Sequence, residues 1–117
     1  MKFVNLTTHP INIIREDGGI ESLQPSGVCA RAYDEQQTRG NIDGIPVRQT
    51  VFGNALELPP ASCDTTYVVS SFVARCVPDR RDVVSPNTHP KAAVRDDKGN
   101  LVAVRGFQCF WSSDPIA

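Results

Sequence analysis

The sequence YVVSSFVARCVPDRRDVVSPN occupies residues 67–87 and holds the densest group of polar side chains in the chain. Its β-branched residues predict a strand over residues 65–70. Its two adjacent serines predict the N-cap of a short helix over residues 71–77, which a proline then ends. The cluster Asp-Arg-Arg-Asp follows at residues 79–82. The segment therefore predicts a strand, a short helix and a charged turn in succession.

Short runs of β-forming residues, separated by turn signals, lie on both sides of this segment. We expect strands over residues 3–6, 11–15, 20–23, 28–33, 45–52, 55–58, 92–95 and 101–107. Gly53-Asn54 predicts the turn of one hairpin, and Asp-Asp-Lys-Gly-Asn at residues 96–100 predicts the turn of another. The polar segment 34–44 predicts an exposed loop.

Many short strands and one short helix indicate a mainly-β fold. We expect a small antiparallel sandwich or partly open barrel with one short helix, and not a βαβ fold. No linker or low-complexity tract interrupts the chain, so residues 1–117 are predicted to form a single domain, with a frayed tail over residues 112–117. Small β domains must protect their sheet edges, and symmetric association is a common way to do so, so we expect a homo-oligomer.

Composition excludes several classes of protein. The 117 residues are 40% hydrophobic and 21% charged, which is typical of a globular chain, and the net charge is −1, which gives no global attraction to nucleic acid. The N-terminus lacks the apolar core of a signal peptide, and no segment reaches the ~18 apolar residues of a membrane span, so we expect a cytoplasmic protein without a membrane partner. The four cysteines are scattered without a close pair, so we expect no metal. The sequence holds no P-loop and no G-x-G-x-x-G motif, and we expect no cofactor.

The serines and arginines of the opening segment predict an anion site. Ser70 and Ser71 would place hydroxyls beside the N–H groups of a helix start. Arg80 and Arg81 could hold a phosphate bidentately, with Asp82 orienting the arginines or taking a ribose hydroxyl. The alternative is structural: the serines cap a helix, and the charged residues pair with one another on a solvated turn.

Three further residues complete the predicted ligand-binding set. Thr-His-Pro occurs twice, at residues 8–10 and 88–90, and supplies both histidines of the chain. Asn5 and His9 lie in a polar stretch between two predicted strands, so we expect them to contact the base or sugar of a nucleotide. Tyr67 could supply a stacking face.

The residues favour binding over catalysis. No cysteine or serine lies in a recognised nucleophile motif. A triad of Ser70, one histidine (His9 or His89) and Asp82 could assemble from distant parts of the chain, but nothing in their spacing indicates it.

Four motifs carry a resemblance to a known group of proteins: VNLTTHPI at residues 4–11, YVVS at 67–70, Arg-Asp at 81–82, and the VRD that opens the late hairpin. Together they resemble a family of small uncharacterised phage and bacterial proteins that open with an N-L-T-x-H segment. Thr8 stands where that family commonly has proline. Small phage-encoded proteins are often counter-defence factors, and one class of them sequesters nucleotide signals of bacterial immunity. By this analogy, the resemblance implies a signal-sequestering protein in the host cytoplasm.

Three functions follow from these patterns. The first is a small-ligand-binding module that holds an anionic, nucleotide-like molecule. The second is an interaction module or inhibitor that docks on another protein, for which the motivation is the apolar segment 107–111 and the polar segment 34–44. The third is a small hydrolase that uses Ser70 or His9.

Overall fold

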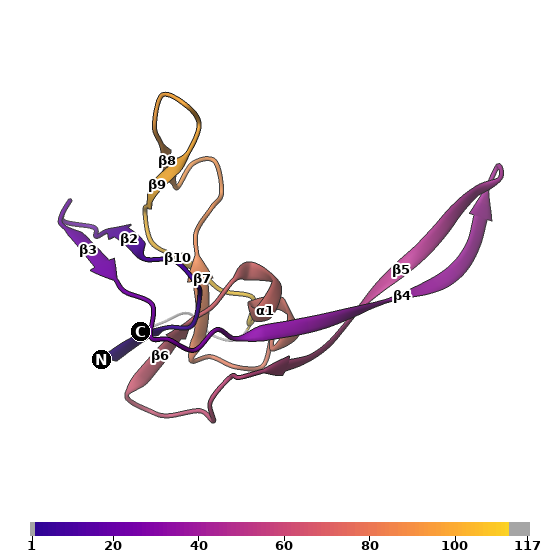
Figure 1. The fold of residues 1–117 in the computed structure, drawn as a ribbon, viewed down its shortest axis with the longest axis horizontal. Helices are drawn as coiled ribbons and strands as arrows, with labels where there is room; N and C mark the ends of the chain where they lie inside the picture. Colours follow the sequence, from indigo (N-terminus) through magenta and orange to yellow (C-terminus); the bar gives the residue numbers. More distant parts are fainter. Residues whose placement is uncertain (1, 113–117) are drawn as a thin grey trace.

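The computed structural model describes residues 2–112, and these residues form ten strands and one short helix (Figure 1). The predicted mainly-β fold with one helix is confirmed, and none of the three sheets closes into a barrel. The predicted tail over residues 112–117 lies outside the described residues, apart from Ser112. No helix among residues 2–112 has the length and hydropathy needed to cross a membrane.

The first sheet is built on parallel strands. Its order is β1 (Lys2–Asn5), β6 (Thr65–Val68), β7 (Val83–Pro86) and β10 (Phe107–Gln108), and the first three of these strands run parallel to one another. Helix α1 (Ser71–Cys76) connects β6 to β7. The fold as a whole is mainly β, as expected, but β6, α1 and β7 form one local βαβ unit that the sequence did not predict. The connection has to contain a crossover, since parallel neighbours cannot be joined by a tight turn.

Helix α1 forms where the sequence predicts it. The Ser70 side chain accepts a hydrogen bond from the backbone N–H of Val73 at 3.3 Å, in the extended backbone conformation typical of an N-cap. Val73 and Ala74 are buried against the sheet. A six-residue helix is unstable alone in water, so this packing is what holds it. The helix ends at Cys76, before Pro78.

The second sheet consists of two hairpins. Its order is β3 (Ile20–Leu23), β2 (Ile11–Ile14), β9 (Leu101–Val104) and β8 (Ala93–Arg95). The strands β2 and β3 form one antiparallel hairpin, and the antiparallel pairing of β8 with β9 confirms the hairpin predicted around residues 96–100. In the second turn, the Asp96 carboxylate accepts hydrogen bonds from the backbone N–H groups of Lys98 and Asn100.

The first sheet forms the middle layer of the body. On the central strand β6, Tyr67 and the following Val69 belong to the cluster beneath α1, whereas Val68 belongs to the cluster with Ile11, Ile13 and Val104 of the second sheet. This division follows from the alternation of side chains across a strand. A strand covered on both faces reads as a continuous apolar run, which is what the sequence shows here.

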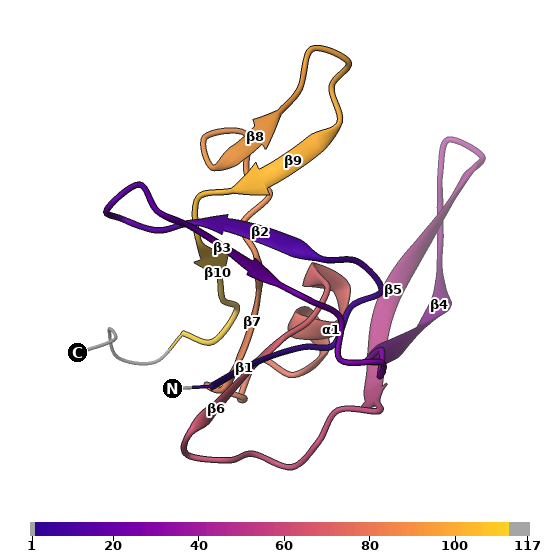
Figure 2. The ribbon, with the colours of Figure 1, turned by 60° about the vertical axis from the view of Figure 1, so that its left-hand side comes forward.

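The third sheet is a long hairpin that extends away from the body (Figures 1 and 2). It pairs β4 (Arg31–Ile42) with β5 (Ile45–Leu56), and we call it the arm. Because of the arm, the radius of gyration is 16.5 Å, against about 13 Å for a compact domain of this length.

Two predictions fail in the arm. The expected loop over residues 34–44 is mostly strand, and the expected turn at Gly53-Asn54 lies within β5, next to an irregularity in the strand register. The true turn is Asp43-Gly44, whose φ angles of 51° and 80° are those of a two-residue hairpin turn. Residues 34–41 form a strand despite their polar character because they pair with residues 46–52 of β5.

Candidate functional site

The register of the central strands separates the predicted ligand-binding residues. Tyr67 pairs with Val83, so Asp82 lies beside the start of β6, while Ser70 follows its end. Four strand residues separate the position of Asp82 from that of Ser70, which corresponds to about 13 Å along the strand. The predicted set therefore divides between the amino ends and the carboxyl ends of the parallel strands.

At the amino ends, Arg80 and Asp82 bind each other. Nε of Arg80 donates to Oδ1 of Asp82, and a terminal nitrogen donates to Oδ2, both at 2.8 Å. The same guanidinium donates to the carbonyl of Pro59 at 2.9 Å and so fixes the segment that leads into β6. The hydrogen bonds from Arg80 lower the pKa of Asp82, and those to Asp82 raise the pKa of Arg80. This pair is a structural bond, as the alternative for the charged turn predicts.

Arg81 contacts an aromatic ring next to that pair. Its guanidinium stands over the ring of Trp111, 5.3 Å from the ring centroid, in a cation–π contact. Arg80, Arg81, Asp79 and Asp82 line the same shallow depression, together with Cys63. Two carboxylates there balance two guanidiniums, so the depression offers an anion no net positive charge.

Asn5 and Tyr67 are parts of the framework. The carboxamide of Asn5 is buried; it donates to the carbonyls of His9 and Leu23 at 2.9 and 3.0 Å, and it accepts from the backbone N–H and the hydroxyl of Thr7. All of its hydrogen-bonding groups are used, so Asn5 shapes the loop before β2 and has no group left for a ligand. The ring of Tyr67 is buried in the core beneath α1, which leaves it no stacking face for a ligand.

At the carboxyl ends, three predicted residues share a groove. His9, Ser70 and Ser71 line a cavity with a volume of about 470 Å³. Thr7 and His9 follow β1, the two serines follow β6, and Thr88 follows β7, so the loops that leave all three parallel strands contribute. Ligands of open sheets with parallel strands characteristically bind at this end, because the loops there converge.

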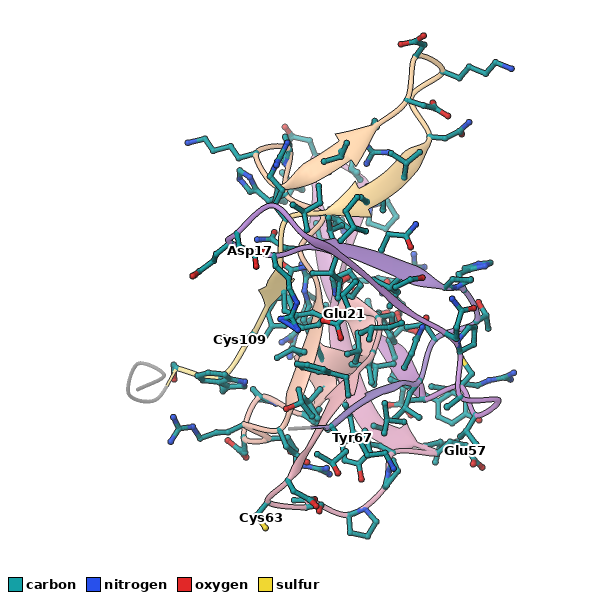
Figure 3. All side chains as sticks on the ribbon, turned by 90° about the vertical axis from the view of Figure 1, so that its left-hand side faces the viewer. Asp17, Glu21, Glu57, Cys63, Tyr67 and Cys109 are labelled. Carbon is teal, nitrogen blue, oxygen red and sulfur yellow. The ribbon has the colours of Figure 1, made fainter. Side chains whose placement is uncertain are left out.

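The floor of the groove is apolar. Ile11 of β2 and Val104 of β9 are buried, while Leu101 and Val102 of β9 are partly exposed toward it. Pro86 closes one side. The β8–β9 hairpin thus covers one end of the molecule, and Cys63, beside the Arg80–Asp82 pair, lies at the other end (Figure 3).

The rim of the groove carries unused hydrogen-bonding groups. Among the residues that the structure describes, the hydroxyls of Ser71 and Thr88 and the imidazole of His9 have no hydrogen-bond partner, and Ser70 uses its oxygen only as an acceptor. No lysine, arginine, aspartate or glutamate within the described part of the chain lines this cavity. The groove therefore suits an uncharged ligand that has an apolar face and several hydrogen-bonding groups.

Of the thirteen described residues that line the groove, the sequence predicts only three as ligand-binding. The two Thr-His-Pro repeats do meet there, but the second contributes Thr88; His89 instead accepts a hydrogen bond from the N–H of Lys91 through Nδ1. The contribution of β9 follows from the parallel contact of Ile13 with Val104, for which the sequence holds no local signal.

The structure does not assemble the triad considered above. Asp82 lies at the other end of the parallel strands from Ser70, and its carboxylate is bound by Arg80. Within residues 2–112, no group of three histidine, cysteine or acidic side chains is placed to hold a metal ion.

Comparison of the chain with protein-family models, with curated proteins and with solved structures found no match.

Proposed function

We propose that this protein is a small-ligand-binding module and that its groove takes a nucleoside-like molecule: a flat ring with hydroxyl or amide groups. The single observation that supports this most is the convergence of loops from three parallel strands on one cavity with an apolar floor and an unpaired polar rim. Its volume of about 470 Å³ is within the usual range for small-molecule sites.

In this proposal the floor of the groove makes apolar contacts with the ligand, and the rim makes hydrogen bonds to it. Leu101 and Val102 offer apolar surface to one face of a ring. The hydroxyls of Ser71 and Thr88 can each donate and accept, and the imidazole of His9 has one nitrogen of each kind when neutral. A ligand that pairs with these groups replaces hydrogen bonds that they now make to water, so specificity comes from the rim and affinity from the floor.

The proposed ligand differs from the anionic molecule that the serines and arginines predicted. Arg80 and Arg81 lie at the amino ends of the strands, out of reach of the groove. A phosphate on the ligand would meet no cationic side chain of the described residues there, so we expect the nucleoside part to supply the binding energy. If a nucleotide binds, its affinity should depend only weakly on salt.

A protein that holds such a ligand without turning it over would act as a sink for it. This behaviour agrees with the signal-sequestering role that the resemblance to phage and bacterial proteins implies. It also separates the proposal from the hydrolase hypothesis, in which the ligand would be converted.

Thermal-shift and calorimetric titration with the four nucleosides, their monophosphates and cyclic dinucleotides tests the proposal. A ligand at ~100 times its Kd adds about 2.7 kcal/mol to the free energy of unfolding, which raises Tm by roughly 10 °C. We expect the best nucleoside to bind as tightly as its monophosphate, within about threefold.

Two matched substitutions locate the site. Val102→Asp places a charge in the groove floor and should weaken binding at least about tenfold. Val28→Asp is the control, because Val28 is equally exposed (44%) and lies outside the groove. If no nucleoside or nucleotide raises Tm, or if Val102→Asp binds like wild type, the proposal is wrong. Nucleotide binding that is lost in Arg81→Ala would instead move the site to the amino ends of the strands.

A further inference from the structure

The arm has one apolar face and one polar face. Side chains alternate along β5, so Ile45, Val47 and Val51 point to the same side. Ile42 pairs with Ile45 across the turn, and Glu35 pairs with Val51, so β4 presents Ile42 and Glu35 on that side too. Tyr33 precedes Glu35 by two residues and shares its side. We define the apolar face of the arm by these apolar residues: Tyr33, Ile42, Ile45, Val47 and Val51.

The opposite face is polar throughout its central part. It carries Gln36, Thr38, Arg48 and Thr50, and Gln36 donates to the hydroxyl of Thr50 at 2.6 Å. Such a two-faced pattern is typical of a ribbon that packs on something through one side.

The described chain leaves most of the apolar face uncovered, although Val51 near its base is partly buried. Ile42 and Ile45 are each 67% exposed, and Tyr33 is 64% exposed. Both views of the ribbon show the outer part of the arm standing clear of the body (Figures 1 and 2). A free two-stranded ribbon is marginally stable in water, so this face calls for a partner.

We propose that the apolar face of the arm docks on the same face of a second copy of this chain, with the two arms antiparallel and related by a two-fold axis at the level of Gln37 and Gln49. This inference concerns a different surface from the groove and does not rest on the proposed ligand.

The residue pattern is complementary to itself in this arrangement. Gln37 and Gln49 pair across the arm and mark its midpoint. Val47 and Val51 lie two residues on either side of that midpoint. Val47 of one copy therefore contacts Val51 of the second copy, and Val51 of the first contacts Val47 of the second. The tip residues of one arm, Ile42 and Ile45, then lie over the base of the other, which carries Tyr33.

The charged residues on this face are also placed symmetrically about the midpoint of the arm. Glu35 lies two residues from Gln37 toward the base, and Arg39 lies two residues from it toward the tip. Nε of Arg39 donates to the side chain of Gln49 at 2.7 Å, which places Arg39 on the apolar side of the arm. In the antiparallel arrangement Glu35 of each copy therefore faces Arg39 of the other, whereas a parallel arrangement about a two-fold axis would lay β4 over β5 and set Glu35 against Val51.

The size of the face indicates a weak dimer. Twelve residues of strand at ~3.3 Å and a width of about 10 Å give a footprint of roughly 400 Å² on each copy. The dimer would bury about 800 Å² in total, which is below the ~1,200 Å² of standard specific interfaces and in the range of weak, transient ones, so we expect a dissociation constant in the micromolar range or weaker. Addition of a strand at the outer edge of β5 is less suitable, because Pro46 lacks the N–H that such pairing needs.

Sedimentation equilibrium of the full chain, from low micromolar to near-millimolar concentration, tests the dimer. Ile45→Thr should raise the dissociation constant at least about tenfold. Ile20→Thr is the matched control: Ile20 is 72% exposed but lies on β3 of another sheet, and its substitution should change nothing. Circular dichroism at low concentration checks that each variant is folded.

A charge exchange tests the arrangement itself. Glu35→Arg alone and Arg39→Glu alone should each weaken self-association about tenfold, because like charges then meet twice in the dimer. An equimolar mixture of these two variants should associate as tightly as wild type, since both contacts between the unlike chains are again of opposite charge. A wild-type chain that stays monomeric at all concentrations overturns the proposal. So does equal weakening by Ile20→Thr, or a mixture that fails to associate.

Discussion

Replacing Asn5 with alanine should destabilise the fold and open the groove at the same time. The side chain of Asn5 is 2% exposed and makes four hydrogen bonds, two as donor and two as acceptor. Its partners are the carbonyls of His9 and Leu23 and two groups of Thr7. The carboxamide therefore joins the end of β1, the loop before β2 and the end of β3.

The size of the effect follows from these contacts. A hydrogen bond contributes about 0.5–1.5 kcal/mol net, and the hydroxyl of Thr7 can turn to water after the substitution. The remaining three bonds then give a loss of about 3 kcal/mol, which corresponds to a fall in Tm of roughly 10 °C. Asn5→Asp should be no better, because a carboxylate cannot donate to the two carbonyls.

Urea denaturation followed by circular dichroism measures this loss. The control is Asn12→Ala: Asn12 is exposed and makes one hydrogen bond, to the carbonyl of Val102 at 3.2 Å, so its loss should stay below about 1 kcal/mol. If Asn5→Ala lowers the free energy of unfolding no more than Asn12→Ala does, the conclusion that the hydrogen bonds of Asn5 hold this loop is refuted.

Two further predictions concern the centre of the first sheet. Because Arg80 lowers the pKa of Asp82, the pair stabilises the fold above the unfolded-state pKa of aspartate, and this contribution is lost as pH falls through the lowered pKa. Asp82→Asn should therefore lower the free energy of unfolding by about 2 kcal/mol near neutral pH. In urea titrations below pH ~4, the difference in this free energy between the variant and wild type should disappear. A gap that persists undiminished in acid would show that the charge of Asp82 is not the source. The hydroxyl of Ser85 is fully buried without a hydrogen-bond partner among the described residues, so Ser85→Ala should raise the urea midpoint, by the equivalent of about 1 kcal/mol; a clear drop in the midpoint would contradict this.

Local signals predict the parts of the fold that local interactions decide. The cap at Ser70, the stop at Pro78 and the turn at residues 96–100 each act over a few residues, and the helix and the late hairpin form where these signals lie. The strand β7 (Val83–Pro86) escaped the sequence analysis, since four residues after a charged cluster carry too little periodicity. Its parallel pairing with β6 depends on contacts across the crossover, and no pattern within β7 encodes them.

The arm shows the opposite difficulty, because its sequence holds two turn signals. Gly53-Asn54 and Asp43-Gly44 are both suitable for a tight hairpin, but only the second allows two twelve-residue strands with ten residue pairs to form. The Gly53 position instead serves an irregular register, where a Cβ would come within 3.2 Å of the carbonyl oxygen of Tyr33. The number of residues that can pair along the two strands therefore decides which turn forms. The turn residues alone do not contain this information.

The sequence predicts the candidate site only in part, because local patterns do not determine the direction of the strands. Ser70, Ser71 and His9 were chosen as polar residues at the ends of apolar strands, and the direction of those strands decides which ends meet. If β6 and β7 were antiparallel, the serines and the Arg80–Asp82 pair would lie at one edge, as the sequence analysis expected. Parallel strands send the serines to the carboxyl edge and leave the charged pair at the amino edge, where it ties Pro59 to the turn. The charged pair therefore lies at the opposite end of these two strands from the groove, so substitutions of Arg80 or Asp82 should change the stability of the fold and leave ligand binding in the groove unchanged.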